Sequence, residues 1–384
     1  MSHLLQLLLL LALVILVAKA AGALAIRMHQ PAVLGEILAG LLFGPTLLNM
    51  PHWPMFAGDA HGGSAFASLH DLAELGVLLL MGIAGMETDL GAMRRVGKVA
   101  LYAALGGVLA PVLGGIAVTM TLGPLIHTGG IDLYHALFIS TVLAATSVSI
   151  SAQTLIELGQ LRSREGTAIL GAAVIDDVVG IVLVSVVLAL HAGATAEHGA
   201  SNLRDVLTAA LGLGQVGSMV LMAVLIVVFF VGAWVLGKLL LERTLQWAEH
   251  LPTSQPLLAI AVAVMLLYAW GAEWIGGVAF ITGSYLAGLL IAQTRYKHLI
   301  EERIAALTYS VFVPAFFMDI GLNADARPLF VPFIDMLRAA APNWGPFIYT
   351  AAICVVAVLA KVIGCGAGAV RGGFTRQEAL RVGV

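Results

Sequence analysis

Eleven long apolar stretches constrain this chain more than any other feature. They lie at 3–26, 31–50, 71–91, 99–123, 134–156, 166–191, 215–238, 256–272, 275–293, 306–322 and 346–370. A transmembrane helix needs about 20 mostly apolar residues, so each stretch is a candidate crossing. Because 60% of the 384 residues are apolar and only 11% are charged, a soluble fold is excluded. The sequence therefore predicts an all-α polytopic membrane protein, with residues 1–384 forming one transmembrane domain of about eleven helices.

Lysine and arginine alternate between the connections of this map. The odd-numbered connections hold fourteen of them, whereas the even-numbered ones hold only Arg204, Arg327 and Arg338. Positive residues collect on the cytoplasmic side of a membrane protein, so the odd connections are expected in the cytoplasm and the N-terminus outside. Only Lys19 and Lys361 lie inside apolar stretches, and Lys19 is expected to extend towards the membrane surface.

Two adjacent carboxylates, Asp176 and Asp177, lie in the middle of the stretch 166–191. An ionisable side chain there costs about 2.5–3.5 kcal/mol on insertion scales, so it is a functional candidate. Neighbours on a helix point about 100° apart, so both can border one cavity. Two carboxylates this close do not ionise together cheaply unless a cation lies beside them. The pair predicts exchange of protons for a cation, and the alternative is a polar pair that only packs helices.

Lys361 is the basic residue in the middle of the stretch 346–370. Ala357, Gly364, Cys365 and Gly368 share its helix face, and such small residues let another helix approach closely. A buried ammonium needs a carboxylate, and Asp176 or Asp177 is the natural partner. The alternative is a fixed structural ion pair. Cys354 lies about three turns from Cys365 on a helix, too far to form a disulfide.

Hydroxyl side chains gather in the segment TVLAATSVSISAQTLIELG, residues 141–159. This composition favours a helix that is broken at mid-membrane, where free carbonyls and hydroxyls can replace an ion's hydration shell. The alternative is a continuous helix whose hydroxyls bond to its own carbonyls.

Glu36 lies beside the packing glycines Gly40 and Gly44, and it is either a cavity-lining carboxylate or a helix-end anchor. Asp319 lies near an external end, where we expect water to reach it.

Other chemistries receive little support from the sequence. The chain lacks H-E-x-x-H and C-x-x-C spacings, so we expect no bound metal and no cofactor. A net charge of −3 gives no reason to expect a nucleic acid partner. An intramembrane aspartyl protease needs its two aspartates on facing helices, and a passive cation channel is obstructed by a buried lysine.

Three segments together resemble one family. They are QPAVLGEILAGLLFGP, AATSVSISAQTLIELG followed by GAAVIDDVVG, and the helix around Lys361. They are similar to the second branch of the monovalent cation:proton antiporters, which includes NapA-type sodium/proton antiporters and Kef-type potassium efflux proteins. Kef-type proteins generally carry Gln-Asp where this chain has Asp176-Asp177, which favours sodium/proton exchange. A potassium/proton antiporter or a Kef-type protein is the alternative.

The resemblance implies further expectations. The fold is the NhaA/NapA-like inverted-repeat fold with a discontinuous helix, in a homodimer of the cell membrane whose core domain moves against a panel of helices. Asp177 binds Na+ (or Li+ or K+) and exchanges it for a proton, and Asp176 pairs with Lys361 when no cation is bound. Thr146 and Ser147 lie at the unwound point beside them. The family's second broken helix is expected to begin near Glu378, so the sequence as given is expected to lack the last two helices.

Overall fold

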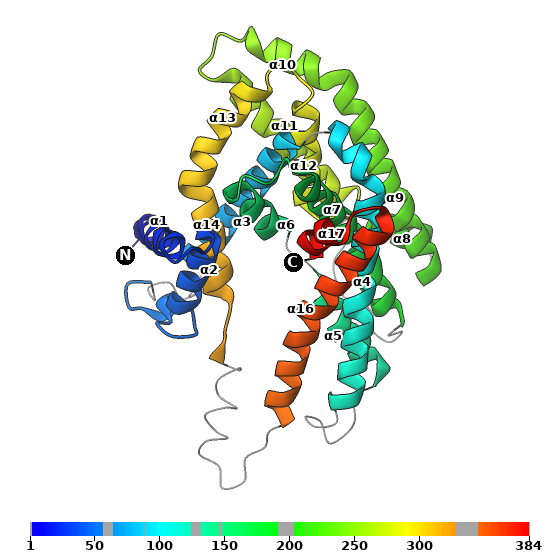
Figure 1. The fold of residues 1–384 in the computed structure, drawn as a ribbon. Helices are drawn as coiled ribbons and strands as arrows, with labels where there is room; N and C mark the ends of the chain where they lie inside the picture. The colour runs from blue at the N-terminus through cyan, green and yellow to red at the C-terminus, as the bar shows by residue number, and fades with distance from the viewer. Residues whose placement is uncertain are drawn as a thin grey trace.

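A computed structural model describes residues 2–56, 64–88, 90–123, 132–145, 148–190, 203–212, 214–327 and 345–383. All regular elements in these ranges are helical (Figure 1), which confirms the predicted all-α class. The α-helices are α1 (His3–Arg27), α2 (Ala32–Phe43), α3 (Ser64–Glu87), α4 (Leu90–Leu122), α5 (Leu133–Ala144), α6 (Val148–Glu157), α7 (Arg164–Leu190), α8 (Leu203–Leu211), α9 (Gln215–Leu236), α10 (Glu242–Glu249), α11 (Pro256–Trp274), α12 (Phe280–Ile291), α13 (Lys297–Leu307), α14 (Val313–Asn323), α16 (Gly345–Gly372) and α17 (Arg376–Gly383). Two π-helical segments, Gly237–Leu241 and Thr308–Phe312, join α9 to α10 and α13 to α14.

The predicted apolar stretches coincide with helices, although their lengths differ. In the described ranges, seven helical segments are long and apolar enough to cross a membrane, and α2, α5 and α12 are shorter apolar helices of 12 residues each. Hydropathy also placed some helix starts too late, because α3 begins at Ser64 and α13 at Lys297. Hydropathy detects only the lipid-facing part of a helix, whereas the backbone hydrogen bonds continue through its polar ends.

Local backbone chemistry shortens the three 12-residue helices. Helix α2 ends at Phe43, and not near residue 50, because Gly44 is extended and Pro45 follows it. Helix α12 begins only at Phe280, after Gly277 has adopted a left-handed φ of +63°. Helix α5 ends at Ala144, where Ala145 has extended backbone angles, and α6 starts at Val148.

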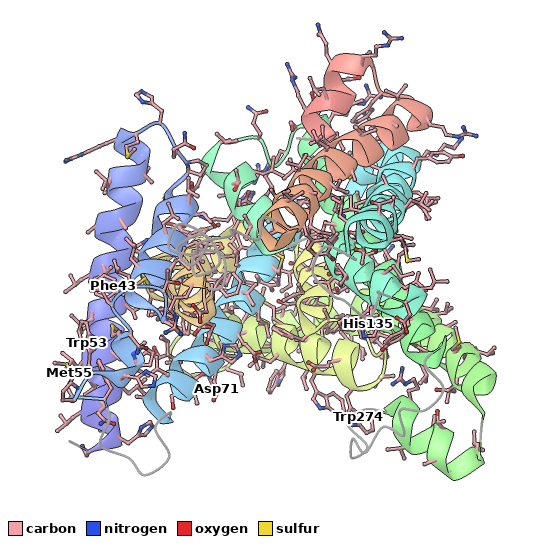
Figure 2. All side chains as sticks on the ribbon, turned by 90° about the horizontal axis from the view of Figure 1, so that it is seen from below. Phe43, Trp53, Met55, Asp71, His135 and Trp274 are labelled. Carbon is pink, nitrogen blue, oxygen red and sulfur yellow. The ribbon has the colours of Figure 1, made fainter. Side chains whose placement is uncertain are left out.

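The helices pack into two groups, which we call the core group and the panel group. The core group contains α4, α5, α7, α16 and α17, and the panel group contains α1, α2, α3, α11, α12, α13 and α14. Helices α6 and α9 contact both groups. Figure 1 shows α16 alongside α4, and the view of Figure 2 sets α1 and α2 on the opposite side of the molecule from these two helices. Two of the rings labelled in Figure 2 belong to Phe43, the last residue of α2, and to Trp53 in the segment after it, and their centroids lie 6.4 Å apart.

Glycines set the close contact between α4 and α16. A Cβ atom added at Gly106 would lie 2.1 Å from the carbonyl oxygen of Gly364, and one at Gly364 would lie 2.2 Å from the carbonyl oxygen of Gly106. A Cβ at Gly368 would likewise meet the backbone oxygen of Tyr102 at 2.0 Å. The small-residue stripe beside Lys361 therefore packs against another helix backbone, as the sequence predicted. This contact brings the lysine into the interior of the core group.

Candidate functional site

Helices α7 and α16 place a carboxylate and an ammonium group together inside the core group. The Nζ atom of Lys361 donates a hydrogen bond to Asp176 Oδ2 at 3.1 Å, and the two side chains are 19% and 10% exposed. Gly107 of α4 lies beside the lysine, where a Cβ would meet Cys365 Sγ at 2.5 Å. Among the described residues, Asp176 Oδ1 is buried and has no hydrogen-bond partner. The site therefore holds one paired and one unused carboxylate oxygen.

The same ammonium group also contacts the end of a helix. Lys361 Nζ donates to the carbonyl oxygen of Ala144, the last residue of α5, at 2.7 Å. The last four carbonyls of a helix lack partners within that helix, so such an end offers oxygen ligands to a cation. Thr146 and Ser147, predicted at the unwound point, follow directly in sequence and lie outside the described residues.

Asp177 points towards the other helix group. It is half-buried, and its Oδ2 atom accepts a hydrogen bond from Thr282 Oγ1 of α12 at 3.4 Å. Thr282 itself is only 3% exposed. The adjacent aspartates thus have different partners, because Asp176 faces a lysine of the core group and Asp177 faces a hydroxyl of the panel group.

Glu36 lies in the panel group, apart from the two aspartates. It is 4% exposed on α2, and its Oε1 atom lies 3.8 Å from the Nζ atom of Lys19 on α1. Lys19 also donates to the carbonyl oxygen of Tyr309, in a π-helical segment, at 2.9 Å. Lys19 thus stays half-exposed while it contacts α2 and the π-helical segment, and its predicted extension towards the membrane surface stays a prediction.

Two further polar contacts connect the panel group to α6 and the segment after it, both at the lysine- and arginine-rich side. Glu157 Oε2 at the end of α6 accepts a hydrogen bond from the backbone N–H of Ala32, in the first turn of α2, at 2.8 Å. Arg162 lies 3.8 Å from Glu301 of α13. An acid at a helix N-terminus satisfies free N–H groups and is favoured by the helix dipole. These two contacts tie α6 and the segment after it to α2 and α13 on the side that the charge count places in the cytoplasm.

Sequence reasoning missed some of these residues and misjudged another. Thr282 and Ala144 carry no charge, so only their three-dimensional position reveals them. Asp319 is 6% exposed, and its Oδ2 atom lies 2.8 Å from His70 Nδ1, so the expectation that water reaches it is wrong. Helix α3 brings the histidine there, which a hydropathy map does not show. The free thiols of both cysteines fit the predicted absence of a disulfide between them.

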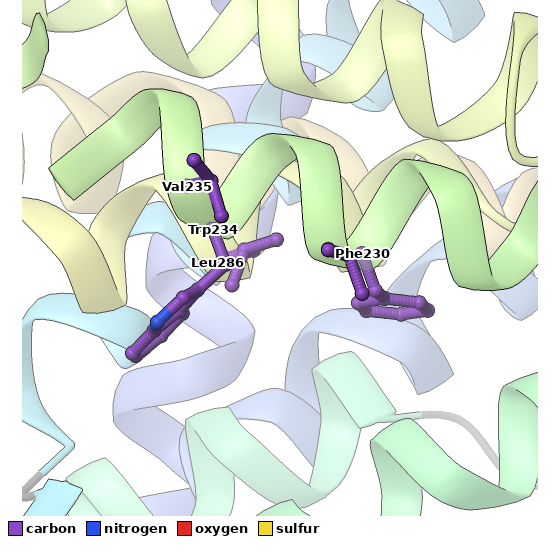
Figure 3. A pocket seen from close by; sticks show the side chains of 5 residues that line it. Phe230, Trp234, Val235 and Leu286 are labelled. Atoms are coloured by element: carbon purple, nitrogen blue, oxygen red, sulfur yellow. The ribbon is translucent and has the colours of Figure 1, made fainter. Parts of the chain in front are cut away.

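An apolar groove elsewhere in the described residues does not contribute to this site. A groove between α9 and α12 is lined by apolar side chains alone, among them Phe230, Trp234 and Leu286 (Figure 3). It contains no group that can bind an ion. Within the described ranges, no group of three or more His, Cys, Asp or Glu side chains is arranged to hold a metal ion.

The chain is similar to several known proteins over most of its length. Residues 9–384 match the family model described as "Sodium/hydrogen exchanger, transmembrane". The chain is 32% identical over 372 residues to the Na(+)/H(+)-K(+) antiporter GerN of Bacillus cereus, covering 97% of this chain and 82% of GerN. It is 30% identical over 370 residues to a Na(+)/H(+) antiporter of Enterococcus hirae, covering 96% and 83%. The sodium proton antiporter MjNhaP1 of Methanocaldococcus jannaschii shares the fold, with a TM-score of 0.61 at 16% identity over 99% of this chain and 82% of that one.

Proposed function

The chain belongs to the sodium/hydrogen exchanger family, and from this premise we propose that it exchanges Na+ for protons across the membrane by alternating access. The assignment to the cation:proton antiporters that the sequence suggested is thereby confirmed. GerN and the Enterococcus hirae protein both carry Na(+)/H(+) exchange in their names, which supports sodium as the cation. The name of GerN also includes potassium, so K+ is the cation to test beside it.

The position of the Lys361 ammonium group carries this proposal. It lies between the carboxylate of Asp176 and the helix-end carbonyl of Ala144, which are the kinds of oxygen ligand that a small monovalent cation binds. A cation entering the site competes with the ammonium group for these oxygens. Na+ binding therefore displaces Lys361, and departure of Na+ restores the ion pair. The Oδ1 atom of Asp176, which has no hydrogen-bond partner among the described residues, gives the entering cation a first ligand.

Asp177 carries the exchanged ion in this mechanism. Its carboxylate binds Na+ or a proton but not both, so loading one releases the other. It lies where the core group faces the panel group, and a movement of one group against the other would expose it to each side of the membrane in turn. We place Thr146 and Ser147 beside it as further ligands, as the family resemblance implies.

We also propose that the protein is a homodimer formed through the panel group. Helix α11 supports this, because Trp270 and Trp274 stack at 5.1 Å on its surface and are 56% and 39% exposed. Large rigid aromatic side chains are enriched at protein interfaces. Cross-linking of α11 between two copies in native membranes tests the arrangement.

Reconstituted vesicles test the exchange directly. A pH-sensitive dye is enclosed in proteoliposomes containing the full chain, and proton movement is followed after a Na+ gradient is imposed. We expect Asp177→Asn to abolish Na+-dependent proton movement. The amide cannot release a proton, and it lacks the negative charge that attracts a cation. Asp71→Asn, which changes an exposed aspartate of α3, is the matched control and should retain exchange.

The outcomes separate the candidate functions. Unchanged exchange in Asp177→Asn would overturn the proposed role of that residue. Proton movement driven by K+ but not by Na+ would replace sodium exchange with potassium exchange at the same site. Cation flux without any proton movement would indicate a channel.

A further inference from the structure

Thr282 is a panel-group residue that touches the exchanging carboxylate. Its Oγ1 atom donates to Asp177 Oδ2 at 3.4 Å, across the boundary between the two helix groups. Within the part of the chain that the structure describes, the charged group that acts on Asp177 is Asp176 of the same helix, and Asp176 is in turn paired with Lys361 of α16. All of these belong to the core group. Thr282 is therefore the contact whose distance to Asp177 has to change when one group moves against the other.

The start of α12 explains why this hydroxyl is free to reach another helix. Threonines inside helices usually bond to the carbonyl four residues earlier, as Thr121 and Thr141 do here. Thr282 lies in the first turn, where its backbone N–H bonds to Ala279, so no helical carbonyl precedes it at that distance. Its side chain bonds to Asp177 instead.

Close packing fixes the position of this hydroxyl. A Cβ at the neighbouring Gly283 would lie 2.1 Å from the carbonyl oxygen of Tyr268, so α12 is pressed against α11. On the other side, Ser284 Oγ donates to the carbonyl oxygen of Leu78 in α3 at 2.6 Å. Thr282 is thus held between two panel helices, and its contact with Asp177 does not depend on a mobile loop.

We propose that Thr282 is a positioning residue through which the panel group sets how readily Asp177 takes a cation in place of a proton. This inference rests on the proposed exchange at Asp177. A hydroxyl that donates a hydrogen bond to an ionised carboxylate stabilises the ionised form. The hydroxyl oxygen can also serve as a ligand to the cation. Alternating access requires two conformations, one open to each side of the membrane. Because the hydroxyl stays with the panel group, it contacts Asp177 in only one of these two conformations. The protein then binds its cation with unequal affinity on the two sides.

The geometry sets the size of the expected effect. At 3.4 Å the contact is at the long end of the range for hydrogen bonds between oxygen atoms. A full bond to a charged group contributes up to roughly 100-fold in an equilibrium, so we expect this longer one to contribute about 3- to 10-fold. Loss of the Thr282 hydroxyl should therefore lower the affinity for the cation without abolishing turnover.

The experiment compares three threonine variants in the vesicle assay. Thr282→Val removes the hydroxyl and keeps the shape, whereas Thr282→Ser keeps the hydroxyl. We expect Thr282→Val to raise the KM for Na+ by about 3- to 10-fold, to leave kcat within about 2-fold, and to move half-maximal exchange to higher pH. Thr282→Ser should restore all three values. Thr244→Val is the matched control, because its hydroxyl bonds within its own helix, to Leu240.

Several results would overturn the inference. Unchanged KM and pH profile in Thr282→Val would do so, as would a Thr282→Ser variant as impaired as the valine variant. If Thr282→Val does not elute as a folded protein, Thr282→Ala replaces it, and wild-type behaviour of that variant counts against the inference. Absence of Na+-dependent proton movement in the wild type refutes the proposed function instead, and exchange that persists in Asp177→Asn refutes the role of that carboxylate, so these failures are distinguishable from failure of the inference.

Discussion

Removal of Lys361 should destabilise the protein, and simultaneous removal of Asp176 should reverse most of that loss. Their side chains are only 19% and 10% exposed and lie 3.1 Å apart. In Lys361→Met, the Asp176 carboxylate stays buried with one oxygen newly unpaired and the other already without a described partner. Breaking a buried ion pair in this way costs about 3–5 kcal/mol.

The double variant supplies the decisive comparison. In Lys361→Met combined with Asp176→Asn, no unpaired charge remains, and exchanging a buried pair for neutral groups is often close to neutral. Asp176→Asn alone leaves the ammonium group its bond to the Ala144 carbonyl, so we expect it to cost less than Lys361→Met. The coupling between the two sites should then reach about 2–3 kcal/mol, near the upper end for residues in contact.

Reversible unfolding of purified protein in mixed micelles with increasing SDS measures these differences. The free energies of unfolding of the wild type, both single variants and the double variant form a double-mutant cycle. Free energy changes that simply add, with the double variant as unstable as the sum of the singles, would refute a coupled buried pair. Near-wild-type stability of Lys361→Met would refute it as well.

Three shorter predictions follow from packing, charge and group movement. A disulfide or short cross-link between cysteines placed at Ala32 and Glu157, in a variant without the native cysteines, should block exchange until it is reduced, because it ties α2 of the panel group to α6, which packs against α7 of the core group. Gly364→Ala should destabilise the protein by about 1–3 kcal/mol in the same unfolding assay, since its Cβ would lie 2.2 Å from a backbone oxygen. Hydrogen bonds from the backbone and hydroxyl of Thr375 lower the pKa of Glu378, so protection of the α17 amides from hydrogen exchange should be constant above pH 4.5 and decline only below it.

Matched controls sharpen these three tests. A cross-link between cysteines at His70 and Asp319 lies within the panel group and should leave exchange intact. Gly97→Ala adds a Cβ that meets nothing within 4 Å and should change stability little. Glu378→Gln should weaken α17 protection at neutral pH and remove its acid dependence. Exchange that survives the first cross-link, or α17 protection already lost between pH 7 and 5, would contradict the structure.

Much of the fold could be predicted because membranes make hydropathy and charge informative. The apolar stretches located the helices, and the stripe beside Lys361 correctly indicated a close helix contact. The ends of α2 and α12 could not be placed, because Gly44 and Gly277 end or delay helices inside stretches that remain apolar. Hydropathy averages over such breaks, since a glycine is hardly less apolar than its neighbours.

The site was predictable where it is charged and unpredictable where it is neutral. A charged side chain costs free energy to insert into a membrane, so Asp176, Asp177 and Lys361 stand out in an apolar chain. Thr282 and the Ala144 carbonyl belong to residue types that are common in membrane helices. They join the site only because helices distant in sequence pack together. Contacts between residues on different helices depend on how the helices pack, and the sequence around each residue does not reveal that packing.

The location of the lysine and its partner in one helix group has a consequence for membrane voltage. Lys361 and Asp176 neutralise each other and travel together, so a movement of the core group with this pair intact carries no net charge from it through the electric field. The field acts with roughly 2.3 kcal/mol per elementary charge at 100 mV. Voltage can therefore drive or hinder only those steps in which the pair is broken or Asp177 carries an uncompensated charge.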